Sequence, residues 1–352
     1  ASEAANFMQA LTPTDNAIGA QSQLRTSEAM GSMMLSRVNQ VRQTGPQGAN
    51  LGAIKMAALS GGKGVMTDGD QTLPTLSEAS PMKPGWSAYG EVRGLRSRIG
   101  AQQGYLGSRT NMVTGLIGLD FSQKNYIVGA ALHVANGDGK QSNRAATSKS
   151  DTYAVSAYGS IFSPKLALDV YATRGTGNLD LTRTAGLLSA VGSTDTTLFN
   201  IGAALSSPTK VKWGSFTPSV SLAYDQVDID AYRETGAIAL SVNKRKVKSF
   251  VGRLGVAAMS DQAKTFKPWA RIALAHDFEA SDSGTKKIGF VSATGPNFVD
   301  VAGLVLDKTW GELGLGIDTK LDKATLGLSY ETTLGRDNVQ IEQIRARIRF
   351  TF

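Results

Sequence analysis

Histidine and cysteine, the side chains most often used as general bases and as nucleophiles, are scarce or absent in this chain. Its 352 residues include two histidines and no cysteine, which excludes thiolate nucleophiles, disulfides and thiolate metal sites. His276 precedes Asp277, but adjacent residues of a strand point to opposite faces and would share a site only across a bulge. No partner constellation accompanies His133, and neither a Gly-X-Ser-X-Gly motif nor a histidine cluster occurs. We therefore expect a non-catalytic chain without metal or cofactor.

The other charged residues occur singly between apolar ones. The last nine residues, IRARIRFTF (344–352), alternate strictly between apolar and polar. A period of two predicts a strand with one face in an apolar environment and the other in water. The net charge of +8 comes from such scattered positions and not from a dense basic run, so we expect no nucleic-acid partner.

The same period of two begins at Trp86 and continues to the end of the chain. It predicts strands of about ten residues, the length that a tilted strand needs to cross a bilayer. Long and short connections alternate, which places long loops at one end of the sheet and tight turns at the other, as in a membrane barrel. The twelve predicted strands are 86–94, 110–122, 125–136, 151–163, 165–175, 195–207, 213–227, 247–260, 266–278, 308–320, 324–335 and 344–352.

The aliphatic side of these strands needs a cover, and one helix is all that remains to supply it. Lipid is the simplest cover, and a soluble β-sandwich is the alternative. No stretch reaches the roughly 18 apolar residues of a membrane-spanning helix, but membrane barrels give a weaker signal per segment. The charged residues expected on the wet, lumen-facing side are Glu91, Arg93, Asp120, Asp169, Arg253, Arg271, Glu312, Asp318, Glu331, Arg345, Arg347 and Arg349.

Residues 15–43 predict a helix of about 40 Å. Asp15 is a suitable N-cap, a thin stripe of methionine and valine follows at helical spacing, and Gly45-Pro46 ends the pattern. Gln, Ser, Thr and Asn cover the other faces, which suits a polar lumen better than lipid; a surface helix on a globular domain is the alternative. The helix arginines expected to pair with lumen carboxylates such as Glu91, Asp120 or Glu312 are Arg25, Arg37 and Arg42.

Three of these features together resemble the translocator domain of monomeric autotransporters, the type Va secretion proteins of Gram-negative bacteria. They are the entry strand GWSAYGEVRG (85–94), the polar helix ending LSRVNQVRQ (35–43), and the terminal strand. The resemblance implies an all-β fold: a 12-stranded antiparallel transmembrane β-barrel over 86–352, with the N-terminal α-helix inside its lumen. Residues 1–14 would be the end of a passenger and residues 44–85 a flexible linker.

The resemblance also implies a role as outer-membrane anchor and translocator, which enables export of the chain's own N-terminal passenger to the cell surface. Residues 1–10 lack the basic start and apolar core of a signal peptide, so we expect the chain to begin inside a longer precursor. The implied partners are outer-membrane lipid, the barrel assembly machinery, periplasmic chaperones and the passenger, with the barrel itself a monomer. The implied outer-membrane assembly signal comprises Ile348, Phe350 and Phe352.

One departure from the family concerns passenger release. Some members cleave an Asn-Asn pair in the lumen helix, whereas this helix has Asn16 and Asn39 but no such pair. That reaction is therefore not expected here. A stand-alone porin or channel, or a barrel enzyme, is the alternative function.

Overall fold

The computed structural model describes residues 16–44, 85–101, 107–142, 146–262, 266–279, 286–290, 299–301, 306–321 and 324–350. The predicted passenger end (1–14), all but the two end residues of the predicted linker (45–84) and Phe352 lie outside this set. The side chains of Arg349 and Phe350 lie outside it as well.

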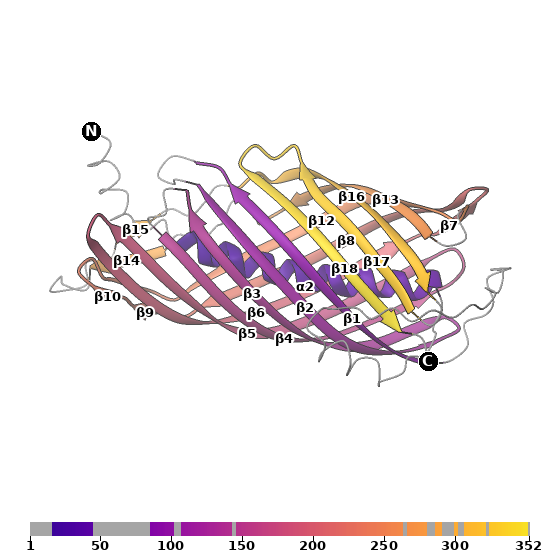
Figure 1. Ribbon diagram of the computed structural model, residues 1–352, viewed down its shortest axis with the longest axis horizontal. Helices are drawn as coiled ribbons and strands as arrows, with labels where there is room; N and C mark the ends of the chain where they lie inside the picture. Colours follow the sequence, from indigo (N-terminus) through magenta and orange to yellow (C-terminus); the bar gives the residue numbers. More distant parts are fainter. Residues whose placement is uncertain are drawn as a thin grey trace.

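Twelve antiparallel strands form a closed barrel (Figure 1), as predicted from the alternation. Neighbours along the chain pair with one another, and β1 pairs with β18 to close the ring, so the barrel has no open edge. The strands are β1 (Gly85–Ile99), β2 (Ser108–Gln123), β3 (Tyr126–Gln141), β4 (Ala146–Phe162), β5 (Ala167–Ala185), β6 (Leu188–Ser206), β8 (Gly214–Ile229), β12 (Arg245–Ser260), β13 (Phe266–Asp277), β16 (Thr309–Leu321), β17 (Ala324–Leu334) and β18 (Val339–Phe350).

Side chains alternate between an apolar exterior and a polar interior. In β4, Tyr153 and Val155 are 63% and 53% exposed, whereas Thr152 before them and Ser156 after them are each 1% exposed. Large exposed apolar side chains recur around the ring, which is the surface that a bilayer would cover.

Aromatic side chains cluster near both ends of this apolar surface. At the end with tight turns, the ring of Phe121 lies 5.3 Å from that of Trp86 and 6.3 Å from that of Tyr126, centroid to centroid. At the opposite end, the rings of Phe250 and Phe278 are 5.4 Å apart. Such girdles are typical of the two interfaces of a membrane barrel.

Several strands extend beyond the predicted bounds. We expected a long loop over 177–194, but β5 and β6 continue pairing to Ala185 and Leu188, and Gly186 takes a φ of +61° at the turn. One face of this extension stays buried, with Leu179 and Leu181 at 0% and 4% exposure, so the alternation continues with the backbone pairing, and the glycines and polar residues of the segment made it look like a loop.

Short additional strands lie at the two ends of the barrel. A four-stranded sheet forms within the connections that follow β8 and β13, at the left-hand end in Figure 1. Its strands, together with the two short strands added to the barrel sheet, are β7 (Thr209–Val211), β9 (Tyr232–Arg233), β10 (Thr235–Gly236), β11 (Leu240–Val242), β14 (Lys286–Phe290) and β15 (Val299–Val301).

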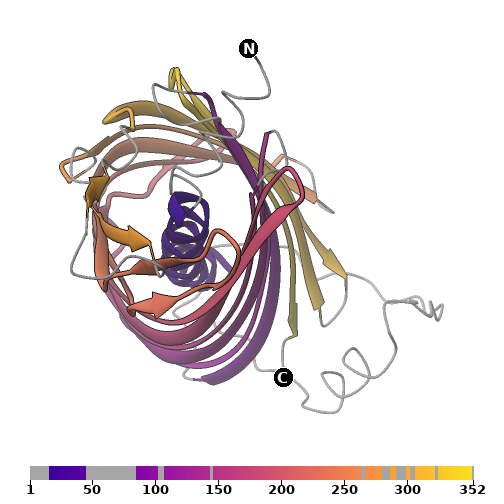
Figure 2. The ribbon, with the colours of Figure 1, turned by 90° about the vertical axis from the view of Figure 1, so that its left-hand side faces the viewer.

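Helix α2 (Asn16–Thr44) lies inside the barrel, as Figure 2 shows in the view along the lumen. Its 29 residues span about 43 Å at 1.5 Å per residue. The helix packs against β2 to β6, β8 and β12, which places it on one side of the lumen. No helix among the described residues combines the length and the apolar character needed to span a membrane.

Candidate functional site

One helix–barrel contact is centred on Asp120 of β2. Arg37 Nε donates to Asp120 Oδ2 at 2.6 Å, Arg37 Nη2 donates to Ser87 Oγ at 2.6 Å, and Tyr158 OH donates to the same Oδ2 at 2.9 Å. The guanidinium also lies over the ring of Tyr89, 4.1 Å from its centroid. The side chains of Arg37 and Asp120 are 1% and 0% exposed, so each charge depends on the other for its compensation.

Glycines of neighbouring strands make room for the two tyrosines. Tyr89 is paired with Gly118, and Tyr158 with Gly129. A Cβ atom at Gly118 would lie 2.5 Å from the ring of Tyr89, and one at Gly129 would lie 2.4 Å from the ring of Tyr158. The close approach therefore requires glycine at both positions.

A second ion pair fixes the C-terminal turn of the helix. Arg42 binds Asp169 of β5 through both terminal nitrogens, with Nη2 to Oδ2 at 2.8 Å, and its Nη1 also donates to Ser160 Oγ at 2.8 Å. Ser160 donates to Asp169 Oδ1 at 2.6 Å. This two-pronged geometry is the strong form of an arginine–carboxylate pair.

Hydroxyl contacts hold the middle and the N-terminal half of the helix. Ser27 Oγ donates to Asp225 Oδ1 of β8 at 2.6 Å, and Asn200 Nδ2 donates to the backbone oxygen of Ser27 at 3.3 Å. Ser22 Oγ lies 3.3 Å from Ser150 Oγ of β4. All three contacts are buried and join the helix to the wall formed by β4, β6 and β8.

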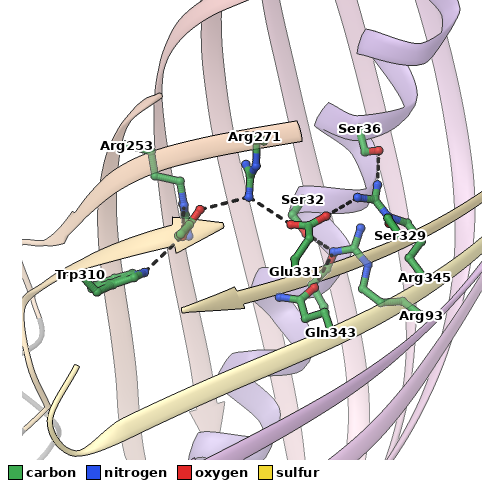
Figure 3. Close-up of polar contacts among 12 residues, drawn as sticks. Ser32, Ser36, Arg93, Arg253, Arg271, Trp310, Ser329, Glu331, Gln343 and Arg345 are labelled. Carbon is green, nitrogen blue, oxygen red and sulfur yellow. Dashed lines mark hydrogen bonds and ion pairs between the residues drawn. The ribbon is translucent and has the colours of Figure 1, made fainter. Parts of the chain in front are cut away.

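The opposite wall carries a chain of ion pairs within the barrel itself (Figure 3). Arg253 Nε lies 2.9 Å from Glu312 Oε1, Arg271 Nη2 lies 3.2 Å from Glu312 Oε2 and 3.0 Å from Glu331 Oε2, and Arg345 pairs with Glu331 on the other side. The ion pairs of this chain join β12, β13, β16, β17 and β18 to one another, and the described residues of the helix form no ion pair with them.

Two further pairs extend this chain. Arg93 Nη2 lies 3.1 Å from Glu91 Oε1, and Arg347 Nη2 lies 2.5 Å from Asp318 Oδ1. From the helix, the hydroxyls of Ser32 and Ser36 accept hydrogen bonds from Arg93 and Arg345 (Figure 3). The backbone oxygen of Ala29 accepts a further one from Arg93 Nη1 at 3.4 Å. A water-accessible cavity of about 290 Å³ separates the helix from the wall.

The charged residues expected in the lumen thus fall into two groups. Asp120 and Asp169 bind the helix, whereas Glu91 and Glu312 pair with arginines of the barrel. Arg25 of the helix pairs with Glu28 one turn further along the same helix, with 2.6 Å between Nη1 and Oε2. The direction in which each arginine points from the helix therefore determines which carboxylate it contacts.

The sequence reasoning missed Asp225, which lies fully buried beneath the helix. Its signal was present, because Asp225 falls on the small, polar face of SVSLAYDQV (219–227), in step with Ser219 and Ser221. The tyrosine–glycine pairs carried no comparable signal, since they depend on the register between strands.

The two histidines lie on different strands, β3 and β13. His133 is 2% exposed, and its Nε2 lies 2.7 Å from Ser156 Oγ in the interior. His276 Nδ1 lies 2.7 Å from Thr309 Oγ1, while the neighbouring Asp277 is buried. No group of three or more metal-ligating His, Asp or Glu side chains occurs within the described part of the chain.

The closed barrel has an apolar exterior and a charged lumen, and the lumen contains a helix. These features define the class of transmembrane β-barrels with an internal helix. The model of the autotransporter beta-domain family matches residues 88–331. The chain belongs to this family, and it is the outer-membrane anchor and translocator domain of a Gram-negative autotransporter, with a passenger of its own. The family is not a class of enzymes, and a stand-alone channel or a barrel enzyme is not favoured.

Solved structures share the fold. The translocator domain of the autotransporter NalP from Neisseria meningitidis is 17% identical, with 76% of this chain and 89% of that chain covered and a TM-score of 0.63. The beta domain of the Bordetella autotransporter BrkA is 16% identical over 76% and 99% of the two chains, with a TM-score of 0.53. The transport unit of AIDA-I from Escherichia coli is 14% identical over 80% and 93%, with a TM-score of 0.54. No curated protein sequence matches.

Proposed function

We propose that α2 is the trailing segment of the passenger and that it closes the lumen once export is complete. The observation that carries this proposal is the pair of ion pairs, Arg37 with Asp120 and Arg42 with Asp169, that join the helix to the barrel wall. Their carboxylates are fully buried and lose their main positive partners if the helix leaves. The helix is therefore held far more firmly than a polar segment resting in a wet channel.

The internally paired wall has a different role in this proposal. Arg253, Arg271, Glu312, Glu331 and Arg345 compensate one another whether or not the helix is present. This half of the lumen can therefore keep its shape while an extended passenger passes along it. The cavity on this side of the helix marks the route.

Removal of the helix tests the proposal directly. Deletion of residues 1–44 should leave a folded barrel, because the strands close on themselves, and should raise the single-channel conductance in planar bilayers. A helix about 10 Å wide fills much of a twelve-strand lumen. Equal conductance with and without the helix would contradict the proposal.

We further propose that the end of β18 is the signal read by the barrel assembly machinery, after periplasmic chaperones deliver the chain, and that the barrel acts as a monomer. Replacement of Phe350 and Phe352 by serine should reduce insertion into the outer membrane, with export across the inner membrane unchanged. Gln343→Ser, on the lumen face of the same strand, is the control. Membrane fractionation and surface protease accessibility report both steps, and a stronger defect in the control would contradict the face assignment.

We also propose that the domain is non-catalytic. The support is that His133 is buried in the interior, with a serine hydroxyl but no exposed surface for a substrate. His276 contacts a threonine near a strand end, and its neighbour Asp277 turns inward. Hydrolysis of ester or peptide substrates by the refolded domain, abolished by His133→Ala or His276→Ala, would contradict this.

A further inference from the structure

The two ends of the barrel differ in their connections, which orients it in the membrane. Residues 124–125 join β2 to β3, and residues 163–166 join β4 to β5, in tight turns at one end. The longer connections, including 230–244 and 278–308, lie at the other end. Short turns face the periplasm and long loops the exterior in outer-membrane barrels, so the end of β1 and the start of β2 belong to the outer leaflet.

Three exposed cations lie at this outer end, on the adjacent strands β1, β2 and β3. The strand register places Arg98 opposite Arg109 and Arg109 opposite Lys140. Directly opposed residues have Cβ atoms about 5 Å apart and point to the same face. Three positive charges therefore share a strip about 10–15 Å wide on the outer surface.

Within the described part of the chain, no ion pair involves these three side chains, and no carboxylate lies directly opposite any of them. Its neighbours in the same row are Gln340 on β18 and Thr147 on β4. Like charges directly opposite one another destabilise a sheet. The arrangement is therefore unfavourable on its own and becomes favourable when an anion lies across it.

The next row toward the membrane centre contrasts with this strip. There, Arg96 is opposite Glu342, and Lys149 is opposite Asp138. Each cation of that row thus has a carboxylate at the facing position. The imbalance is confined to the row formed by Arg98, Arg109 and Lys140.

The position of the strip relative to the apolar surface indicates the kind of anion. On β2, Arg109 is four residues beyond Val113, which is 54% exposed. On β1, Arg98 is six residues beyond Val92, which is 53% exposed. At about 3.3 Å per residue along strands tilted by about 40°, Arg109 and Arg98 lie roughly 10 and 15 Å beyond these apolar side chains. Their long side chains can extend back toward the membrane and reach the level of lipid headgroups.

We propose that Arg98, Arg109 and Lys140 bind the phosphate groups of a phosphorylated glycolipid of the outer leaflet, of the lipid A type. Guanidinium groups bind phosphate through two parallel hydrogen bonds, and the lysine adds a compact charge. The strip lies one row of paired charges beyond the surface that acyl chains cover, so a lipid can place its phosphates at the strip and its acyl chains on that surface, whereas free phosphate satisfies the charge alone. This inference rests on the barrel and its orientation, and it is independent of the role proposed for the helix.

The test is binding of bis-phosphorylated lipid A to the refolded chain in neutral detergent, counted by native mass spectrometry. The triple variant Arg98→Gln/Arg109→Gln/Lys140→Gln should bind at least about tenfold more weakly than the unmodified chain. The control variant, Lys124→Gln/Lys165→Gln/Lys212→Gln, also loses three positive charges, but in the turns and short connections at the periplasmic end. It should bind lipid A as strongly as the unmodified chain does.

Further arms distinguish the source of the phosphate. Dephosphorylated lipid A should bind weakly to the unmodified chain, and millimolar inorganic phosphate should not displace the phosphorylated lipid. If the triple variant fails to fold, Arg109→Gln, at the centre of the strip, should by itself weaken binding several-fold and Arg109→Lys should retain most of it. Equal binding by the triple variant and the control, or equal binding of the dephosphorylated lipid, would overturn the proposal. Displacement by inorganic phosphate would overturn the choice of a lipid.

Discussion

Replacement of Arg37 by methionine should open the lumen, because it breaks a buried ion pair between the helix and the barrel. The variant keeps a side chain of similar length but leaves Asp120, which is 0% exposed, with Ser87 and Tyr158 as its hydrogen-bond donors. Removal of one partner from a buried pair costs about 3–5 kcal/mol. At 1.4 kcal/mol per factor of ten, the equilibrium between bound and released helix shifts by on the order of 10²- to 10³-fold.

The assay is the open fraction of single barrels in planar bilayers, with Arg25→Met as the matched control. Arg25 is an arginine of the same helix, but its ion pair is with Glu28 of the helix and not with the barrel. Its loss should leave the open fraction nearly unchanged. A second change, Asp120→Asn in the Arg37→Met background, should restore much of the closure, because a neutral amide needs no buried counter-charge.

The reasoning would be refuted by either of two results. Arg25→Met could open the lumen as much as Arg37→Met, which would mean that any loss of helix charge is sufficient. Alternatively, the Asp120→Asn change could increase opening further, which would mean that the carboxylate is not an uncompensated charge in the single variant.

Three other changes test separate parts of the structure. Gly31→Leu should weaken helix seating, since a Cβ atom there would lie 2.4 Å from the Tyr171 hydroxyl; the open fraction should rise, and Gly31→Ala should have the smaller effect. Glu234→Ala should make the connection after β8 sensitive to added protease while the barrel stays heat-modifiable. The reason is that Arg183, at the extracellular end, loses its buried carboxylate partner, at a local cost of about 3–5 kcal/mol. Equal protease resistance would contradict this. Ile344→Asp should reduce membrane insertion, because this side chain is 60% exposed on the apolar exterior; normal insertion would argue against that surface facing lipid.

The barrel could be predicted because its physical cause is local. A strand between lipid and water must alternate, so the pattern from Trp86 onward carried the strand number and the two faces directly. Over 177–194 the loop expectation was wrong, because β5 and β6 keep pairing beyond the predicted bounds and keep one buried face, which includes Leu179 and Leu181. The ends of strands are therefore fixed by backbone pairing, and short alternating runs among glycines and polar residues were too weak a signal to locate them.

The contents of the lumen were predictable as a class of residues but not as pairs. The polar surface of the helix indicated a wet interior, and the wall charges were identifiable by their face. Whether Arg37 reaches Asp120 and Arg25 stays with Glu28 depends on the rotation and height of the helix in the barrel. The helix rotates about 100° per residue, so a small turn exchanges one partner for another, and no local pattern fixes that turn.

The position of the helix in the lumen is the central claim, and cross-linking tests it most directly. The chain has no cysteine, so a pair introduced by Ser22→Cys and Ser150→Cys reports on that contact alone. The two hydroxyls are 3.3 Å apart, on α2 and β4, within reach of a disulfide. We expect near-complete cross-linking of the membrane-inserted protein under mild oxidation, and little from Ser22→Cys with Ser329→Cys on the opposite wall. Absence of the first cross-link, or equal yield from both pairs, would contradict a helix fixed against β4 in the lumen.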